Sequence, residues 1–272
     1  PVISIGGDTV FCAGESTVLT ATGAETYTWS NGLTGDSITV NVPGTFTVVG
    51  LSAAGCENEA AVTVEELPLP DVFIEGELSF CEGESTVLVA NGADSYSWSD
   101  GSTIDSIVVS APGLIVLTGT TADGCTAEDS VEVEELPLPD VAIDCNTAFC
   151  AGEGTVLTAS GAVTYLWSNG FAGDNINVTV PGVYTVEGTS ADGCVNIDTI
   201  EVQELPLPDV TIDGADTFCT GQSTTLTASG AESYIWSNGE TGPSITVNVA
   251  GTYTVTGISV DGCEAEASVD VA

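Results

Sequence analysis

The chain has 272 residues, with 40 Asp and Glu and with no Lys, Arg or His. A formal net charge of −40 excludes nucleic acid as a partner, because affinity for phosphates comes from Lys and Arg. Catalysis usually needs His or Lys as a base, or Arg to hold an anion, so we do not expect an enzyme. No apolar run of about 18 residues occurs, so we do not expect a membrane-embedded protein.

Composition nevertheless predicts a folded chain. Hydrophobic residues make up 43% of the sequence and charged residues only 15%, whereas disordered acidic chains lack the apolar residues for a core.

Period-two patterns predict strands through the first 66 residues. A short strand is expected at 2–5, and others at 16–22 and 26–31. Ile38, Val40 and Val42 then alternate with polar residues, as do Phe46 with Val48 and Val62 with Val64. Glycine-containing turns separate these segments, and no helical period appears.

The whole pattern repeats every 69 residues without insertion. We therefore expect four domains, at residues 1–66, 71–135, 140–204 and 209–272, called repeats 1 to 4 below. Linkers are expected at 67–70, 136–139 and 205–208, where Leu-Pro-Leu-Pro favours an extended, semi-rigid conformation. Pro1 is in register with the last proline of a linker, so we expect a window from a longer array.

The fold class expected is all-β, a tandem array of four immunoglobulin-like antiparallel sandwiches. Two details favour this fold. A tryptophan stands in the third strand of each repeat, and Gly-x-Tyr-x-Val at Tyr184 and Tyr253 resembles a tyrosine corner. Phe46 and Ile115 replace that tyrosine in repeats 1 and 2, so its hydroxyl is not required for folding.

The sequence frame from Phe149 to Cys194 resembles the immunoglobulin-like and PKD-like repeats of giant surface proteins in the Bacteroidota. It reads F-C-x-G-x-x-T-x-L-x-A, Y-x-W-S-N-G, P-G-x-Y-T-V and D-G-C, with small variations among repeats. That family includes the SprB-like adhesins of gliding motility. The resemblance implies export by the type IX system, display on the outer cell surface and an adhesive or spacer filament. No ligand-binding tip or sorting domain is matched.

Eight cysteines form four pairs with a constant spacing of 44 residues, and Cys145 is left over. Regular pairs in an exported chain predict disulfides, since no His or Cys-x-x-Cys supports zinc. The expected disulfide cysteines are Cys12, Cys56, Cys81, Cys125, Cys150, Cys194, Cys219 and Cys263.

Two disulfide connectivities stay open. In a standard sandwich the two cysteines of a repeat lie at opposite poles, so a bond between repeats, such as Cys12 to Cys125, is conceivable. We favour bonds within a repeat, because related single domains carry the same pair and the early cysteine can lie on a segment that crosses toward the last strand. Cys145 stands where the other repeats have glycine, and we expect it to be unpaired, either without a role or available to another molecule.

Acidic residues at the linkers suggest a further site. Those of each linker could approach an aspartate in the last hairpin of the next repeat, and Ca²⁺ takes six to eight oxygen ligands. Calcium is therefore a candidate cofactor at the joints. The candidate ligands are Glu65, Glu66, Asp71, Asp123, Glu134, Glu135, Asp140, Asp192, Glu204, Asp209 and Asp261.

Asp-Ser or Asp-Thr followed by a small or aliphatic residue is similar to the O-glycosylation motif of exported Bacteroidota proteins. On that resemblance, Ser37, Ser106 and Thr199 are candidate glycosylation sites.

These observations predict a structural protein, a semi-rigid stalk of stapled repeats that presents an adhesin for surface attachment or gliding motility. Its expected partners are adjoining repeats of the same larger protein, together with an extracellular surface or glycan bound by a tip outside this chain. The alternative is a module whose own repeats bind a glycan or surface. That alternative predicts clustered exposed aromatic residues, of which only Phe171 gives a sign.

Overall fold

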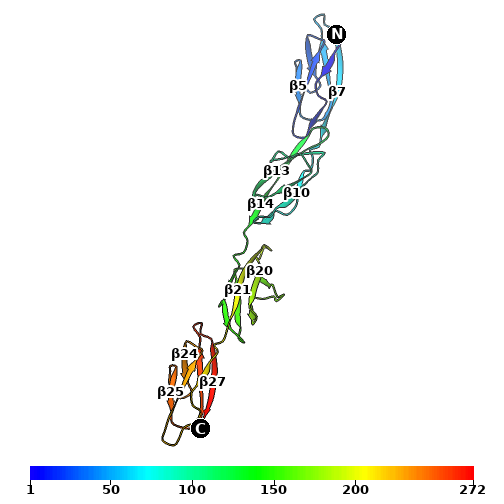
Figure 1. Cartoon of the computed structure of the whole chain (residues 1–272). Helices are drawn as coiled ribbons and strands as arrows, with labels where there is room; N and C mark the ends of the chain where they lie inside the picture. The colour runs from blue at the N-terminus through cyan, green and yellow to red at the C-terminus, as the bar shows by residue number, and fades with distance from the viewer. The chain divides into compact units, whose positions relative to one another are not determined.

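A computed structural model describes all residues, 1–272, and contains 27 strands and no helix (Figure 1). It accordingly contains no helix of the length and apolar character that crossing a bilayer requires. The chain divides into two compact units, Pro1–Leu136 and Pro137–Ala272, each of which holds two repeats.

Repeat 1 is a sandwich of two sheets. One sheet has the order β1-β3-β5 and the other β2-β7-β6-β4. The bounds are β1 Ser4–Gly6, β2 Val10–Cys12, β3 Thr17–Thr22, β4 Thr26–Trp29, β5 Ser37–Val40, β6 Gly44–Leu51 and β7 Glu57–Leu67.

Repeats 2 and 3 repeat this topology. The strands of repeat 2 are β8 Phe73–Glu75, β9 Ser79–Cys81, β10 Thr86–Asn91, β11 Ser95–Trp98, β12 Ser106–Val109, β13 Gly113–Thr120 and β14 Thr126–Leu136. Those of repeat 3 are β15 Ala142–Asp144, β16 Ala148–Cys150, β17 Thr155–Ser160, β18 Thr164–Trp167, β19 Asn175–Val178, β20 Gly182–Thr189 and β21 Val195–Leu205.

Repeat 4 has two three-stranded sheets, with orders β22-β23-β25 and β24-β26-β27. Its strands are β22 Thr211–Asp213, β23 Thr224–Ser229, β24 Ser233–Trp236, β25 Ser244–Val247, β26 Gly251–Ile258 and β27 Glu264–Val271. The expected tandem array of immunoglobulin-like sandwiches is thereby confirmed.

Each repeat has its own hydrophobic core between its two sheets. In repeat 1 the alternating residues Leu19, Ile38 and Val48 point inward and are at most 4% exposed. Val42, expected to continue this inward series, is instead exposed, because β5 ends at Val40. Burial of one face per strand is what the period-two pattern predicts.

The tryptophan that ends β4, β11, β18 or β24 lies in the core of its repeat. Trp29 is 2% exposed, and its Nε1 donates to the backbone oxygen of Gly35 at 3.0 Å. A buried indole N–H needs such a partner, and the turn before β5 supplies it. The equivalent bonds of the other repeats start from Trp98, Trp167 and Trp236.

The tyrosine corner is present in repeats 3 and 4. The Tyr184 hydroxyl donates to the backbone oxygen of Val180 at 2.8 Å, and that of Tyr253 to Val249 at 3.0 Å. Repeats 1 and 2 form the same sandwich with Phe46 and Ile115 at this position, packed against their cores.

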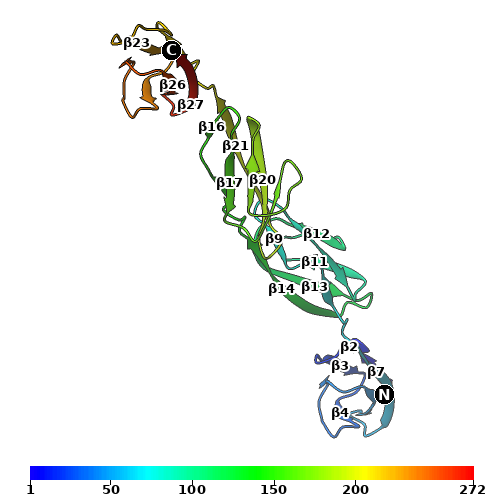
Figure 2. The same ribbon diagram turned by 90° about the horizontal axis from the view of Figure 1, so that it is seen from below.

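One strand pairing was not predicted. The short strand β2 pairs in parallel with the end of β7, and the same holds for β9 with β14 and for β16 with β21 (Figure 2). As a result β7 continues to Leu67, the first residue of the expected linker. This pairing places the first cysteine of repeats 1 to 3 beside the joint that follows that repeat.

Candidate functional site: disulfides across the joints between repeats

The first cysteine of repeat 1 lies at the end of that repeat where the chain leaves it. Cys12 is in register with Leu67, and the next residue, Ala13, donates its backbone N–H to the Leu67 oxygen at 2.8 Å. Phe11 points into the core and is 6% exposed. Because neighbouring side chains of a strand alternate in direction, Cys12 points away from that core.

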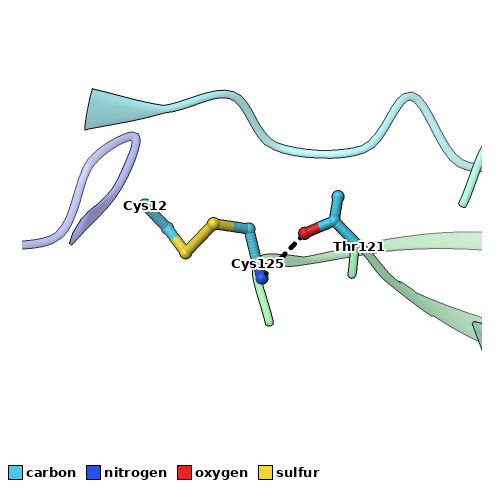
Figure 3. Close-up of a disulfide and its surroundings, with 3 residues drawn as sticks. All are labelled: Cys12, Thr121 and Cys125. Atoms are coloured by element: carbon cyan, nitrogen blue, oxygen red, sulfur yellow. Dashed lines mark hydrogen bonds between the residues drawn. A yellow bond between two sulfur atoms is a disulfide. The ribbon is translucent and has the colours of Figure 1, made fainter. Parts of the chain in front are cut away.

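The second cysteine of repeat 2 lies in the hairpin between β13 and β14. The Cys125 backbone N–H donates to the Thr121 hydroxyl at 3.0 Å, and its oxygen accepts from the Thr121 N–H at 2.9 Å (Figure 3). Gly124 completes the turn with a φ of 91°, a conformation that favours glycine. The hairpin therefore holds Cys125 in one fixed position.

Cys12 and Cys125 form a disulfide that joins repeat 1 to repeat 2 (Figure 3). The two Cα atoms are 5.5 Å apart, within the ordinary range for a disulfide, although 113 residues separate them in sequence. Cys150 and Cys263 form the same bond between repeats 3 and 4, again with 5.5 Å between Cα atoms and 113 residues between them. The pattern is thus the first cysteine of one repeat bonded to the second cysteine of the next.

The expectation of bonds within a repeat is therefore wrong. The first cysteine lies where the chain leaves its repeat, because β2 pairs with the end of β7. The second lies near the opposite end: in repeat 3, Asn196, two residues after Cys194, donates from its side chain to the oxygen of Pro139, where the chain enters the repeat. Cysteines at opposite poles of one sandwich cannot meet, and Cys12 and Cys150 instead bond to cysteines of the repeat that follows.

The remaining cysteines differ in state. Cys81 and Cys194 are disulfide-bonded. Cys56 and Cys219, both expected in disulfides, are free and exposed. Cys145 is free and half-buried.

Cys145 packs against the core of repeat 3. Burial raises the pKa of its thiol, and the neighbouring carboxylate of Asp144 raises that pKa further. Both effects disfavour the thiolate, which is the reactive form.

Within each of the two units, the calcium ligands expected at the joint do not assemble. The structure contains no group of three or more Asp, Glu, His or Cys side chains placed to hold a metal ion. Glu65 and Glu66 are consecutive residues of β7, so their side chains point to opposite faces of the sheet. All the acidic residues named for this site are exposed: Glu65, Glu66, Asp71, Asp123, Glu134, Glu135, Asp140, Asp192, Glu204, Asp209 and Asp261.

The candidate glycosylation sites occupy different environments. Ser37 and Ser106 lie in β5 and β12, which are edge strands; Ser37 is exposed and Ser106 half-buried. Thr199 is exposed in β21, a strand paired on both sides. All three remain candidates by sequence motif.

Shallow depressions recur beside β4, β18 and β24 in repeats 1, 3 and 4. The largest, about 760 Å³, is lined by residues 21–28 and 34–36. Its aromatic residue, Tyr27, is 8% exposed, and its hydroxyl is occupied by the backbone of Ala24 at 2.7 and 2.9 Å. The depression therefore presents no open aromatic face for a sugar ring. Phe171 is 52% exposed but is the sole aromatic residue at its turn among the four repeats.

No family model and no curated protein matches this sequence. Among solved structures, the chain is similar over its whole length to the eight N-terminal Ig domains of Down Syndrome Cell Adhesion Molecule, with 16% identity and a TM-score of 0.36. It spans about half of that structure, 54%. A 1.5-MDa bacterial ice-binding adhesin matches 75% of the chain and 98% of its own, with 12% identity and a TM-score of 0.30. A Bacteroides ovatus protein, SGBP-B in complex with a mixed-linkage heptasaccharide, matches 74% of the chain and 70% of its own, with 18% identity and a TM-score of 0.19.

Proposed function

We propose that this chain is a load-bearing segment of an extracellular array, in which disulfides join consecutive repeats and the array spaces or presents an adhesive element. The observation that carries the proposal is the bond between the first cysteine of one repeat and the second cysteine of the next, found at Cys12–Cys125 and Cys150–Cys263.

These bonds suit a protein under tension. A pulling force applied to the two ends of the chain passes through each bridge, and the loops 13–124 and 151–262 are then shielded from it. Each bridge also restricts the unfolded chain, which for a loop of this size is worth about 5 kcal/mol on the chain-entropy model. Bonds within a repeat would protect single domains but would leave the joints dependent on their linkers alone.

Location and partners follow from the same features. Disulfides persist in oxidising compartments, which supports an extracellular or cell-surface position. The Bacteroidota resemblance supports the finer proposal of type IX export and a SprB-like adhesin. The repeats lack exposed aromatic clusters, so we assign any glycan or surface contact to a tip outside this chain. We assign no catalytic role, because the chain offers no His, Lys or Arg.

Single-molecule stretching from the two termini tests the proposal. With both bridges formed, the shortest covalent path contains about 48 residues, namely 1–12, 125–150 and 263–272. At roughly 3.5 Å per residue the oxidised chain should extend to no more than about 170 Å, whereas the reduced chain should reach about 950 Å.

A matched pair of variants provides the control. Cys12→Ser with Cys125→Ser should lengthen the oxidised chain beyond about 170 Å, because the path through residues 13–124 is no longer bridged by that bond, while Cys145→Ser should change nothing. Equal extension of the oxidised and reduced wild-type chains would contradict the load-bearing role.

A further inference from the structure

We infer that Cys56 and Cys219 each form a further disulfide between repeats, of the same kind as the two observed. Cys56, a second cysteine, bonds to a first cysteine, and Cys219, a first cysteine, bonds to a second cysteine. In each case another repeat with this sequence frame supplies the partner. This inference rests on the proposed function, since it extends the same bonding pattern. It commits to one partner, a cysteine that a second copy of this chain supplies.

The hairpin of Cys56 already has the bonded geometry. Its backbone N–H donates to the Ser52 hydroxyl at 3.2 Å, and its oxygen accepts from the Ser52 N–H at 3.0 Å. Gly55 has a φ of 79°. These are the contacts that Thr121 and Gly124 make around Cys125, so the hairpin is formed before any bond is made.

Cys56 differs from the bonded cysteines at the same position in its exposure to solvent. Cys125 is 1% exposed and Cys263 is fully buried, each bonded to the preceding repeat of its unit. Cys56 holds the same position in repeat 1 but is exposed and free. Both of these bonded cysteines are buried by their partner repeat. The exposed sulfur of Cys56 is therefore open to the first cysteine of another repeat.

Cys219 is the corresponding first cysteine of repeat 4. The segment before Cys219 makes backbone hydrogen bonds to the end of its repeat, as the segment before Cys12 does. The Phe218 N–H donates to the Ala272 oxygen at 3.0 Å, and the Ala272 N–H donates to the Asp216 oxygen at 2.8 Å. The turn after the cysteine is also the same, with Gln222 donating to the Cys219 oxygen at 2.8 Å, as Glu15 does to Cys12. Cys12 is half-buried in its bond, and Cys219 is exposed.

The bond forms by thiol–disulfide exchange. Both thiols lose their protons, and the cysteine pair loses two electrons to the disulfide of oxidised glutathione. One S–S bond forms between Cys219 and Cys56, the S–S bond of glutathione disulfide breaks, and two glutathione thiols are released.

The test uses two full copies of the chain joined through Glu-Leu-Pro-Leu, the residues found at 66–69. This insert puts Cys219 of the first copy 113 residues before Cys56 of the second, the separation in both observed bridges. The short joint keeps the two thiols at high effective concentration. Cys145→Ser in both copies, with Cys56→Ser in the first and Cys219→Ser in the second, leaves only the inner pair of these free thiols.

After equilibration with reduced and oxidised glutathione, we expect a peptide linking Cys219 of the first copy to Cys56 of the second, and loss of both titratable thiols. Two thiols that remain titratable while the Cys12–Cys125 and Cys150–Cys263 peptides are present would overturn this inference alone. Absence of those internal peptides as well would overturn both the inference and the proposed function. A matched tandem chain with the additional change Cys219→Ser in the first copy should keep one reactive thiol, at Cys56.

Discussion

At position 145 a cysteine stands where repeats 1, 2 and 4 have glycines with positive φ, Gly7, Gly76 and Gly214. No residue other than glycine has a positive φ in this structure, so the backbone of repeat 3 takes another conformation here. In the glycine repeats a Cβ would collide with backbone; at Gly7 it would lie 2.1 Å from the Val18 oxygen. The different backbone conformation at position 145 leaves room for a side chain, and the Cys145 sulfur packs against the core of repeat 3.

We predict that Cys145 reacts slowly with iodoacetamide near neutral pH. Burial and the Asp144 charge both raise the pKa of its thiol, so a smaller fraction is thiolate at a given pH, and its rate should keep rising as pH increases. Asp144→Asn removes one of the two causes and should speed the reaction. Peptide mass spectrometry measures the rate, with exposed Cys56 and Cys219 as references in the same sample. A Cys145 rate equal to theirs, and unchanged in the variant, would contradict the prediction.

At the scale of elements, strand β26 contains two glycines that differ in the space available for a side chain. A Cβ at Gly257 would lie 2.4 Å from Cγ2 of Val210 and 2.9 Å from Cβ of Ala231, two half-buried residues that pack against the core of repeat 4. A Cβ at Gly251 would meet no atom within 4 Å, and this residue has no positive φ.

We therefore predict that Gly257→Ala lowers the free energy of unfolding by about 1–3 kcal/mol, because overpacking forces the core apart. Gly251→Ala is the matched control in the same strand and should stay within about 0.5 kcal/mol of wild type. Urea unfolding followed by tryptophan fluorescence measures both. Similar values for the two variants would show that the close approach at Gly257 does not limit packing.

Strands and cores could be predicted from the sequence because their signal is local. Alternation of apolar and polar residues in β3, β5 and β6 determines which face is buried, and the repeat multiplies that signal. The parallel pairing of β2 with β7 could not be predicted in this way, since it joins residues 55 apart and β2 has only three residues. The disulfide connectivity depends on that pairing. The favoured bonds within a repeat are therefore wrong, although every bonded cysteine is among the eight that the sequence predicts.

For the whole molecule, the side-chain charges are all negative and repel one another. The chain has 40 carboxylate side chains and no basic side chain, so apart from its terminal amine it has no group with which to form an ion pair. Repulsion is strongest when the charges are held close in the folded state, and salt shortens its range from about 30 Å at 0.01 M to about 8 Å at 0.15 M. We predict that raising NaCl over this range raises the melting temperature of the oxidised protein, measured by scanning calorimetry.

The nature of the cation provides the control for this prediction. Within each unit the exposed acidic residues at the joint form no group of three or more ligands, so we expect calcium to act as a divalent counterion. Ca²⁺ and Mg²⁺ at equal ionic strength should then raise the melting temperature equally. Mg²⁺ is the informative comparison because it has the same charge but demands a tighter octahedral site. A larger shift with Ca²⁺ than with Mg²⁺ would indicate specific ligation at the joints, and a melting temperature that falls with NaCl would show that repulsion between carboxylates does not limit the stability of this array.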